Sequence, residues 1–494
     1  MSGHFKVNFD PVLLSLGYRC LMSAVLEQHD DQSGDLTIAA KLAEFALGID
    51  LAQVPNEVLT HAKHCILDAC GIALASGTYE FAHKATKGIT ALADTDGHYP
   101  VIGSELTLPL RDAVLLNGIL VHGLDFDDTH AGSIVHCTAS AWPLALGAGL
   151  RASCNGAQAL AAYIVAVEMD ARIGNLAQGG FQQRGHHPTG LVGAFGAAIA
   201  AGKLSELSVE QLTRAQGIVL SMAAGNLEFL SAGDWTKRMH PGWAGVCGLT
   251  AAALAKAGFL GPTTPYEGRY SIYNLHLGEG NEITPSDILT GLGQQWELLD
   301  VGFKPFPACH FNHAFADCAI ALRNDHALDP NDIQSVTALI HPKQMNVVCE
   351  PEAAKRRPTS SYEAQFSLHY LVAASLIQGR FTLEELTPSA YEDQQTLALA
   401  DRVICRPDPD STYPQHYCGE LEITLNNGQV LRHREAVNRG ARENPISAGA
   451  ITDKFMANAT LAVSADHASE IAETILNLDQ IDSLKPVANL LRAR

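Results

Sequence analysis

Residues 116–149 read LNGILVHGLDFDDTHAGSIVHCTASAWPLALGAG, and the rest of the chain is organised around this stretch. It begins as an apolar helix, turns sharply polar between Asp125 and His130, and returns to small apolar residues beyond His136. Acidic and imidazole side chains beside an apolar helix are costly to bury unless they are paired with other groups or serve a function. Helix capping accounts for one of them, with Asp128 a good N-cap residue, but one helix start does not need the whole set. The stretch therefore predicts a functional site.

The size and charge of the chain limit the classes of protein to consider. A chain of 494 residues is too long for one ordinary core, so two domains are expected. Its composition, 47% hydrophobic and 17% charged, is that of a globular enzyme. The formal net charge of -20 argues against a nucleic-acid partner. An anionic substrate would then need local cations set against this background.

Cysteine usage and the first residues bear on the compartment. The eleven cysteines are scattered without a CxxC pair, which indicates reduced thiols in a cytoplasmic compartment, or a mitochondrial one in a eukaryote. Residues 1–34 are expected to form an N-terminal extension, with a short helix over 12–26 and a linker over 29–34, rather than a secretory signal. No window shows the uninterrupted apolar length of a membrane span, so no membrane partner is expected.

Apolar residues at helical spacing dominate the chain up to about residue 294 and predict a helical body. The expected helices cover 36–47, 58–72, 110–121, 138–150, 156–174 and 191–204. The helix over 191–204 is built largely of Ala, Gly and Val, so other helices can approach it closely and it is expected at the centre. Its N-terminus should present free backbone N–H groups, which suit a substrate carboxylate, and His187 comes just before it.

A second polar segment, residues 234–242, holds three potential cations within four residues: Lys237, Arg238 and His240. An exposed basic turn is the simplest interpretation of such a segment. However, a helix of small, buried-type residues follows it, which places the segment against the core.

The pattern changes after residue 295. Residues 336–341 and 421–425 alternate as strands, and Asn427-Gly428 is a strong hairpin signal. Helices are expected over 314–322 and 362–377. The predicted fold is thus mainly α with an α+β lid, in which 35–294 and 437–494 form the helical domain and 295–436 form the lid.

Four motifs, in the same order, resemble the MmgE/PrpD family: HGLDFDDTH (122–130) followed by His136, GHHPTG (185–190), TKRMHPG (236–242) and KPFPACHFNH (304–313). The resemblance covers nearly all of residues 36–480. This family contains 2-methylcitrate dehydratases, cis-aconitate decarboxylases and an iminodisuccinate epimerase. The resemblance implies a helical domain, a smaller α+β domain and a homodimer formed through the helical body.

The resemblance also implies roles for individual residues. It places His187 in the active site and Lys237 against the substrate. In decarboxylase-like members an active-site histidine sits close to the position of Cys309, and His310 is one residue later. Gln365 stands where a basic residue is usual, so substrate contacts are expected to differ.

These residues favour a lyase that needs no cofactor and no metal ion. Imidazoles poised near neutrality can move a proton on or off a carbon beside a carboxylate, and Lys237 can hold carboxylates. Asp125 is expected to orient a histidine or to raise its pKa. The predicted catalytic residues are His136, Asp125, His187 and Lys237, and the predicted substrate-binding residues are Thr129, His240, Arg238, Cys309 and His310.

The predicted substrate is a small anionic carboxylate. The reaction is dehydration of a 2-methylcitrate-like hydroxy-tricarboxylate or decarboxylation of a cis-aconitate-like acid, with epimerisation by the same proton chemistry as the first alternative. A less favoured alternative is a metal-dependent hydrolase, because its consecutive ligands would diverge along the chain: His122, Asp125, Asp127, Asp128 and His130. A non-catalytic binding protein is disfavoured by the combination of His136, His187 and Lys237.

Overall fold

The computed structural model describes residues 36–93, 97–231, 233–278 and 280–492. The expectations for residues 1–34 lie outside this part of the chain. Residues 38–494 form one compact unit. Its apolar side chains gather in two cores, one drawn from the helical regions at both ends of the chain and one from the region between them.

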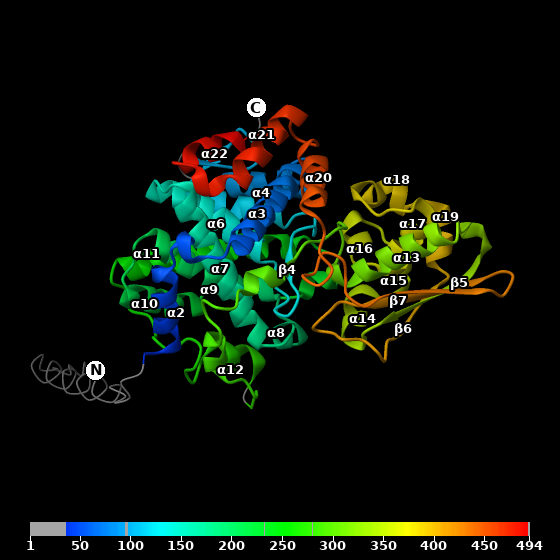
Figure 1. The fold of residues 1–494 in the computed structure, drawn as a ribbon, viewed down its shortest axis with the longest axis horizontal. Coiled ribbons are helices and arrows are strands. Elements are labelled where there is room, and N and C mark those ends of the chain that lie inside the picture. The colour runs from blue at the N-terminus through cyan, green and yellow to red at the C-terminus, as the bar shows by residue number, and fades with distance from the viewer. Residues whose placement is uncertain (1–35, 94–96, 232, 279, 493–494) are drawn as a thin grey trace, which may run out of the picture. The chain divides into compact units, whose positions relative to one another are not determined.

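The first core is helical, as the sequence predicts. Its principal helices are α2 (Ile38–Gly48), α3 (Asn56–Ser76), α4 (Glu80–Thr90), α5 (Leu110–Val121), α6 (Cys137–Ala152), α7 (Gly156–Leu176), α9 (Pro188–Leu204), α10 (Val209–Leu220) and α11 (Thr236–Lys256). Shorter helices α8 (Gly180–Gln183) and α12 (Ile272–Leu277) lie between or after them. The terminal helices α20 (Ala448–Ala459), α21 (Ala465–Leu476) and α22 (Leu484–Leu490) return to this core (Figure 1).

Helix α9 is the centre of this core, and it packs against α6, α7, α10 and α11. Its small residues allow this close packing. A Cβ added at Gly248 of α11 would lie 2.5 Å from the backbone of Ala197 in α9, and one at Gly118 of α5 would lie 2.4 Å from Gly242 of α11. These contacts fix the starts of α9 and α11, where two of the candidate site motifs lie.

The second core belongs to an α+β domain. Its sheet has the order β6-β5-β7-β8, with β5 (Ile333–Ile340) parallel to β6 (Val403–Pro407) and antiparallel to β7 (Gly419–Leu425). Strand β8 (Val430–Glu435) pairs with β7 through the predicted hairpin, in which Gly428 has a φ of +86°. Helices accompany the sheet (Figure 1): α13 (His313–Asp325), α14 (Pro342–Val348), α15 (Glu352–Arg356), α16 (Ser361–Gln365), α17 (Leu368–Gln378), α18 (Pro388–Tyr391) and α19 (Gln394–Ala400).

One expected helix, 362–377, is divided into two. Helix α16 ends at Gln365 and α17 begins at Leu368. The Ser367 side chain lies between them and accepts a hydrogen bond from the Tyr370 backbone N–H at 3.0 Å. The residue thus acts as an N-cap that starts a new helix, and the apolar periodicity of the segment did not reveal this.

The two cores meet between Phe303, which belongs to the first core, and Phe306, which belongs to the second. Two short strands connect the signature stretch to this junction, because β3 (Thr129–His130) pairs with β4 (Val301–Gly302). The 122–136 segment therefore lies where the helical and α+β domains join.

Among the described helices, α3 alone is long and apolar enough to cross a membrane by length and composition. The sequence was expected to contain no segment long and apolar enough to span a membrane. However, 72% of its most apolar window is buried within the fold, where it packs against α5 and α20. Its apolar character is that of a core helix.

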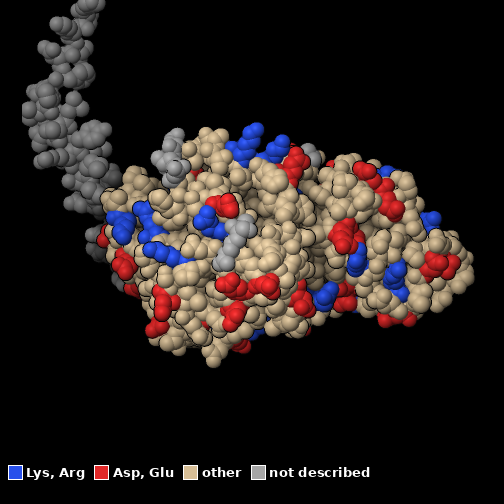
Figure 2. Space-filling view, turned by 90° about the horizontal axis from the view of Figure 1, so that it is seen from above, with Lys and Arg blue, Asp and Glu red and all other residues tan. Residues whose placement is uncertain are grey.

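Figure 2 shows acidic and basic side chains interspersed over one face of the described residues.

Candidate active site

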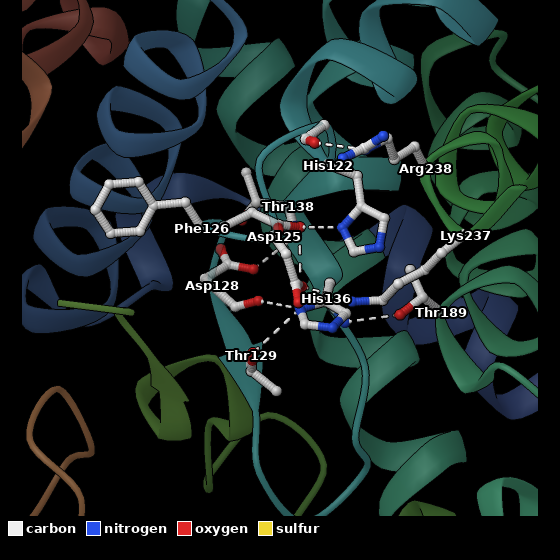
Figure 3. A network of polar contacts seen from close by, with 12 residues as sticks. His122, Asp125, Phe126, Asp128, Thr129, His136, Thr138, Thr189, Lys237 and Arg238 are labelled. Carbon is white, nitrogen blue, oxygen red and sulfur yellow. Dashed lines mark hydrogen bonds and ion pairs between the residues drawn. The ribbon is translucent and has the colours of Figure 1, made fainter. Parts of the chain in front are cut away.

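The loop between α5 and α6 carries the polar residues of the signature, and all of the principal ones are buried. Two of its residues, Asp125 (φ +49°) and Ile134 (φ +56°), adopt left-handed backbone conformations that are uncommon outside glycine. Such conformations are retained where the surrounding contacts hold the chain in place. They turn the carboxylate of Asp125 and the ring of His136 toward a common region (Figure 3).

Asp125 is bound by two lysines from distant parts of the chain. Its Oδ1 lies 2.5 Å from Lys237 Nζ at the start of α11 and 2.9 Å from Lys304 Nζ. Lys304 also donates to the backbone oxygen of Asp125 at 2.9 Å. Burial alone would raise the pKa of Asp125, but the two ammonium groups outweigh it and hold that pKa well below its usual value. The group thus holds two cations and one anion, which leaves one positive charge.

The carboxylate that supports a histidine is Asp127, not Asp125. Asp127 Oδ2 lies 2.7 Å from His122 Nδ1 and 3.9 Å from His136 Nδ1. Asp125 does not orient a histidine by a hydrogen bond, because its carboxylate binds the lysines and Asp127, two residues later, takes that position. The other half of the expectation holds, since burial lowers the pKa of His122 and the charge of Asp125 acts to raise it.

His136 is fixed by contacts on three sides (Figure 3). Its Nδ1 lies 2.8 Å from the Asp128 backbone oxygen and 3.1 Å from Thr129 Oγ1, and its backbone N–H donates to Thr189 Oγ1 of α9 at 3.1 Å. A carbonyl can only accept, so we assign the ring proton to Nδ1 and the free lone pair to Nε2. Burial and the neighbouring Lys304 hold the pKa of His136 well below its usual value, so the ring is neutral near pH 7.

His187 lies at the N-cap position of α9, beside His240. The two Nδ1 atoms are 2.9 Å apart. Burial, His240 and Lys237 hold the pKa of His187 well below its usual value. The backbone N–H groups of Gly190 and Leu191 donate to the His187 carbonyl, so these two amides are not among the free N–H groups expected at this helix start.

Asp128 differs from its acidic neighbours. Its Oδ1 accepts a hydrogen bond from the Thr138 backbone N–H at 3.2 Å, close to the start of α6. Burial, with a contribution from Asp127, raises the pKa of this carboxyl to about 7. Asp128 is not the N-cap residue of α6, which is His136, but its carboxylate accepts a hydrogen bond from the first turn of that helix. With a pKa of about 7, it is half protonated near neutral pH.

The candidate residues surround a cavity of about 50 Å³ at the junction of the two domains. The loop and helices of the helical domain contribute Asp125, Thr129, His136, His187 and Lys237, and the segment leading into the α+β domain contributes Lys304, Cys309 and His310. Phe366 and Tyr417 close it from the α+β domain. A larger depression of about 1310 Å³ on the helical domain shares none of this lining, and none of its described lining residues is a histidine. The chemistry therefore points to the smaller cavity.

Two predicted substrate-binding residues do not line the cavity. Arg238 points away from it: its Nε donates to the Gly123 backbone oxygen at 2.7 Å, and its guanidinium lies over the rings of Phe81 and Tyr362. Arg238 therefore has a packing role, because a helix directs consecutive residues to different sides. His240 lies behind His187 and contacts the cavity through it.

Cys309 and His310 both border the cavity, as expected for two of the predicted substrate-binding residues. Burial raises the pKa of the Cys309 thiol to about 11, which leaves it protonated and a poor nucleophile near neutral pH. His310 Nε2 lies 2.9 Å from the Asn438 side-chain nitrogen, and burial lowers its pKa to about 3. Both groups are thus uncharged polar surfaces at the end of the cavity.

Lys304 is the site residue that the sequence analysis missed. The lysine is fully buried, and its contacts with Asp125 join residues 179 positions apart. The sequence did point to this lysine, because Lys304 is the first residue of the KPFPACHFNH motif. A lone lysine before two prolines gave no indication of its partner.

The ligand set considered for a metal hydrolase is dispersed. Asp125 binds the lysines, Asp127 pairs with His122, and Asp128 accepts a hydrogen bond from the first turn of α6. His130 contacts Ser133 and Glu297. These five residues do not converge on one point.

The candidate site is thus a cavity lined by imidazoles and buried ammonium groups at the junction of a helical and an α+β domain. Family models bear on its identity: the MmgE/PrpD N-terminal domain matches residues 40–284 and the MmgE/PrpD C-terminal domain matches residues 306–480. The chain belongs to the MmgE/PrpD family.

Curated relatives match nearly the whole chain. Cis-aconitate decarboxylase from Homo sapiens is 27% identical over 474 residues, covering 92% of this chain and 95% of the relative. A cis-aconitate decarboxylase-like protein, oryM, from Aspergillus oryzae is 25% identical, covering 91% and 96%. Cis-aconitate decarboxylase from Aspergillus terreus (strain NIH 2624 / FGSC A1156) is 23% identical, covering 94% and 98%.

Proposed function

We propose that this protein is a lyase that needs no cofactor and decarboxylates a small tricarboxylate of the cis-aconitate type. One observation carries the proposal: His136, an imidazole fixed by its contacts, borders the same cavity as Lys237 and Lys304, whose charges exceed that of Asp125 by one. The names of the relatives support this choice of substrate class.

The two lysines bind the substrate. A substrate carboxylate that approaches Lys237 and Lys304 meets the surplus positive charge in a site of low dielectric, where the attraction is much stronger than in water. Asp125 holds both ammonium groups in place before the substrate arrives, so little reorganisation is needed on binding. Thr129 and His310 offer further polar contacts in the cavity.

His136 supplies the proton. Binding of a polyanion stabilises the charged imidazolium and so raises the pKa of His136 from its depressed value. The carboxylate on the substrate's methylene carbon then leaves as carbon dioxide, and its bonding electrons form a new carbon–carbon double bond. The original double bond shifts its electrons to the carbon beside another carboxylate, and that carbon takes the proton from His136. The lysines stabilise the negative charge that develops on that carboxylate.

Dehydration of a 2-methylcitrate-like acid is the second candidate, and the neutral state of His136 favours it. A neutral imidazole with a free Nε2 is ready to remove a proton from the carbon beside a carboxylate. The hydroxyl group on the adjacent carbon would then leave as water after it gains a proton. Epimerisation would begin with the same proton removal and end with its return to the opposite face.

A panel of tricarboxylates incubated with the purified protein and followed by proton NMR tests the proposal. We expect a cis-aconitate-like acid to lose one carboxylate, while loss of water from 2-methylcitrate would favour the second candidate. Lys237→Ala is expected to raise KM, because it removes a carboxylate partner from both the ground state and the transition state. The control variant is His186→Gln, which changes a half-buried histidine that does not line the cavity and should leave KM at the parent's value. A panel that stays unchanged would contradict the proposal.

We extend the proposal to a homodimer formed through the helical domain, which the family resemblance implies. The scattered cysteines favour a cytoplasmic compartment, or a mitochondrial one in a eukaryote. We expect light scattering at micromolar concentration to give twice the mass of the 52.7 kDa chain. A monomer would overturn this part of the proposal.

A further inference from the structure

Three histidine rings converge at the inner end of the candidate site. The ring centroids of His122 and His136 are 4.7 Å apart, those of His122 and His187 are 5.7 Å apart, and those of His136 and His187 are 6.0 Å apart. One ring nitrogen from each lies within 4.8 Å of the other two. The proposed lyase reaction needs one proton-transferring imidazole and does not account for three.

Each ring already uses its Nδ1. His122 Nδ1 lies 2.7 Å from the Asp127 carboxylate, His136 Nδ1 lies 2.8 Å from the Asp128 carbonyl, and His187 Nδ1 lies 2.9 Å from His240 Nδ1. The Nε2 atoms therefore remain for another partner. In particular, His122 Nε2 is buried and has no hydrogen-bond partner, which is costly for a polar atom.

The surroundings suit a cation. Histidine binds a metal ion through a ring nitrogen that carries no proton. Asp127 behind His122 reproduces the carboxylate–histidine arrangement that orients metal ligands and increases their basicity. The negative charge of Asp127, next to His122, offsets the one positive charge that Lys237 and Lys304 leave after pairing with Asp125.

We propose that His122, His136 and His187 form a binding site for one divalent ion of the zinc type, and that the bound ion holds the enzyme inactive. Three nitrogen ligands and an open fourth position are an arrangement typical of Zn²⁺. With zinc–nitrogen distances of about 2.0–2.1 Å, tetrahedral ligand atoms lie about 3.4 Å apart, whereas the ring nitrogens lie within 4.8 Å of one another, so they must approach by at most about 1.4 Å.

Inhibition follows from the position of the ion. An ion on Nε2 of His136 occupies the lone pair that accepts and returns the proton. This consequence rests on the proposed function, whereas binding of the ion does not. The two parts of the inference can therefore fail separately.

Titration of the EDTA-treated full-length protein with Zn²⁺, followed by calorimetry, tests binding directly. We expect one ion per chain, and His122→Gln, His136→Gln and His187→Gln should each weaken binding by more than about 100-fold. Asp127→Asn should weaken it by roughly 10–100-fold, the range found for residues that orient metal ligands. If His122→Gln does not fold, the binding measured for His187→Gln tests the site, because His187 borders the cavity.

Two controls separate this site from other potential ligands. His130→Gln removes a histidine from a neighbouring group, formed with Glu297 and Asp300, and should leave binding unchanged. Substituting Co²⁺ should give the visible spectrum of a tetrahedral nitrogen site without a thiolate-to-metal band. Binding lost in His130→Gln, or a thiolate band that disappears in Cys309→Ser, would overturn the proposal, as would unchanged binding in the His187→Gln protein.

Activity gives the second readout. EDTA treatment should leave turnover of the tricarboxylate unchanged, and one equivalent of Zn²⁺ should abolish it. Activity lost on EDTA treatment and restored by a divalent ion would overturn the inhibitory role and assign the metal a catalytic one. Binding without lyase activity in any condition would instead contradict the proposed function and leave the metal site standing.

Discussion

Asp125 shows how a single residue organises the site. Its carboxylate accepts hydrogen bonds from two buried lysines, one from the helical domain and one from the segment that leads into the α+β domain. Removing one partner from a buried ion pair leaves an uncompensated charge, and the cost is far larger than that of an exposed pair. The anion is therefore more important for stability than either cation.

A double-mutant cycle tests this asymmetry. Asp125→Asn leaves two buried ammonium groups without a counter-charge and should lower the free energy of unfolding by about 3–5 kcal/mol. Lys304→Met leaves the Asp125–Lys237 pair intact and should cost less. The double variant should be more stable than Asp125→Asn alone, as measured by denaturant unfolding. Strictly additive effects would contradict the shared-carboxylate arrangement.

Asp128 makes stability depend on pH. Its pKa is about 7 in the folded protein and about 3.8 in the unfolded chain, so between these values the folded protein holds a proton that the unfolded chain releases. The contribution of Asp128 to the free energy of unfolding is thus fully present below pH 4. It falls as the pH rises toward 7 and stays at its lowest value above pH 7. Asp128→Asn removes this dependence.

Relative to the parent, the Asp128→Asn protein should gain up to about 4 kcal/mol of unfolding free energy between pH 4 and pH 8. Unfolding curves of both proteins at several pH values measure the difference. A difference that stays constant with pH would show that Asp128 ionises at its ordinary pKa in the folded protein.

At the scale of elements, the helices were predictable and the contacts between them were not. Apolar periodicity located the helices that became α5, α7 and α9, because each buries one or more faces in the first core. The same signal missed the break at Ser367, since a cap depends on one side-chain hydrogen bond. His136, His187 and Lys237 were found through local motifs, whereas the pairing of Lys304 with Asp125 depends on the tertiary fold.

The close approach of α9 and α11 can be tested with a matched pair of glycine substitutions. Gly248→Ala places a methyl group 2.5 Å from the α9 backbone and should lower stability by about 1–3 kcal/mol or more. It should also lower activity, because α9 begins next to His187 and α11 carries Lys237.

Gly88→Ala is the control, because Gly88 lies on the exposed face of α4 with nothing within 4 Å of an added Cβ. This change should instead raise stability by about 0.5–1 kcal/mol through helix propensity. Thermal unfolding of both variants gives the comparison. Equal effects of the two changes would argue against tight packing of α9 on α11.

At the scale of the whole molecule, the site is narrow and lies between two domains. The cavity of about 50 Å³ is small beside the roughly 300–1,000 Å³ of small-molecule sites, and its wall is shared by two domains. Tyr417 of the α+β domain donates a hydrogen bond to the Ala131 backbone oxygen of the helical domain at 2.8 Å. We infer that the α+β domain acts as a lid that moves outward to admit the substrate.

Hydrogen exchange measures this opening. Peptides covering 306–311 and 413–418 should exchange more slowly when cis-aconitate is bound, because the closed arrangement is then favoured. Tyr417→Phe removes the contact with Ala131 and should speed exchange in the free protein. Exchange that is the same with and without the ligand would indicate a rigid junction.

The central claim is that His136 delivers the proton to the substrate carbon. Turnover of cis-aconitate in deuterated water, followed by NMR, tests it most directly. The parent protein should give a decarboxylated product that carries one deuteron on the carbon beside a carboxylate. His136→Gln should cut this turnover by roughly 10²–10⁴-fold while the protein stays folded. A folded His136→Gln protein that forms the deuterated product at the parent's rate would contradict the account.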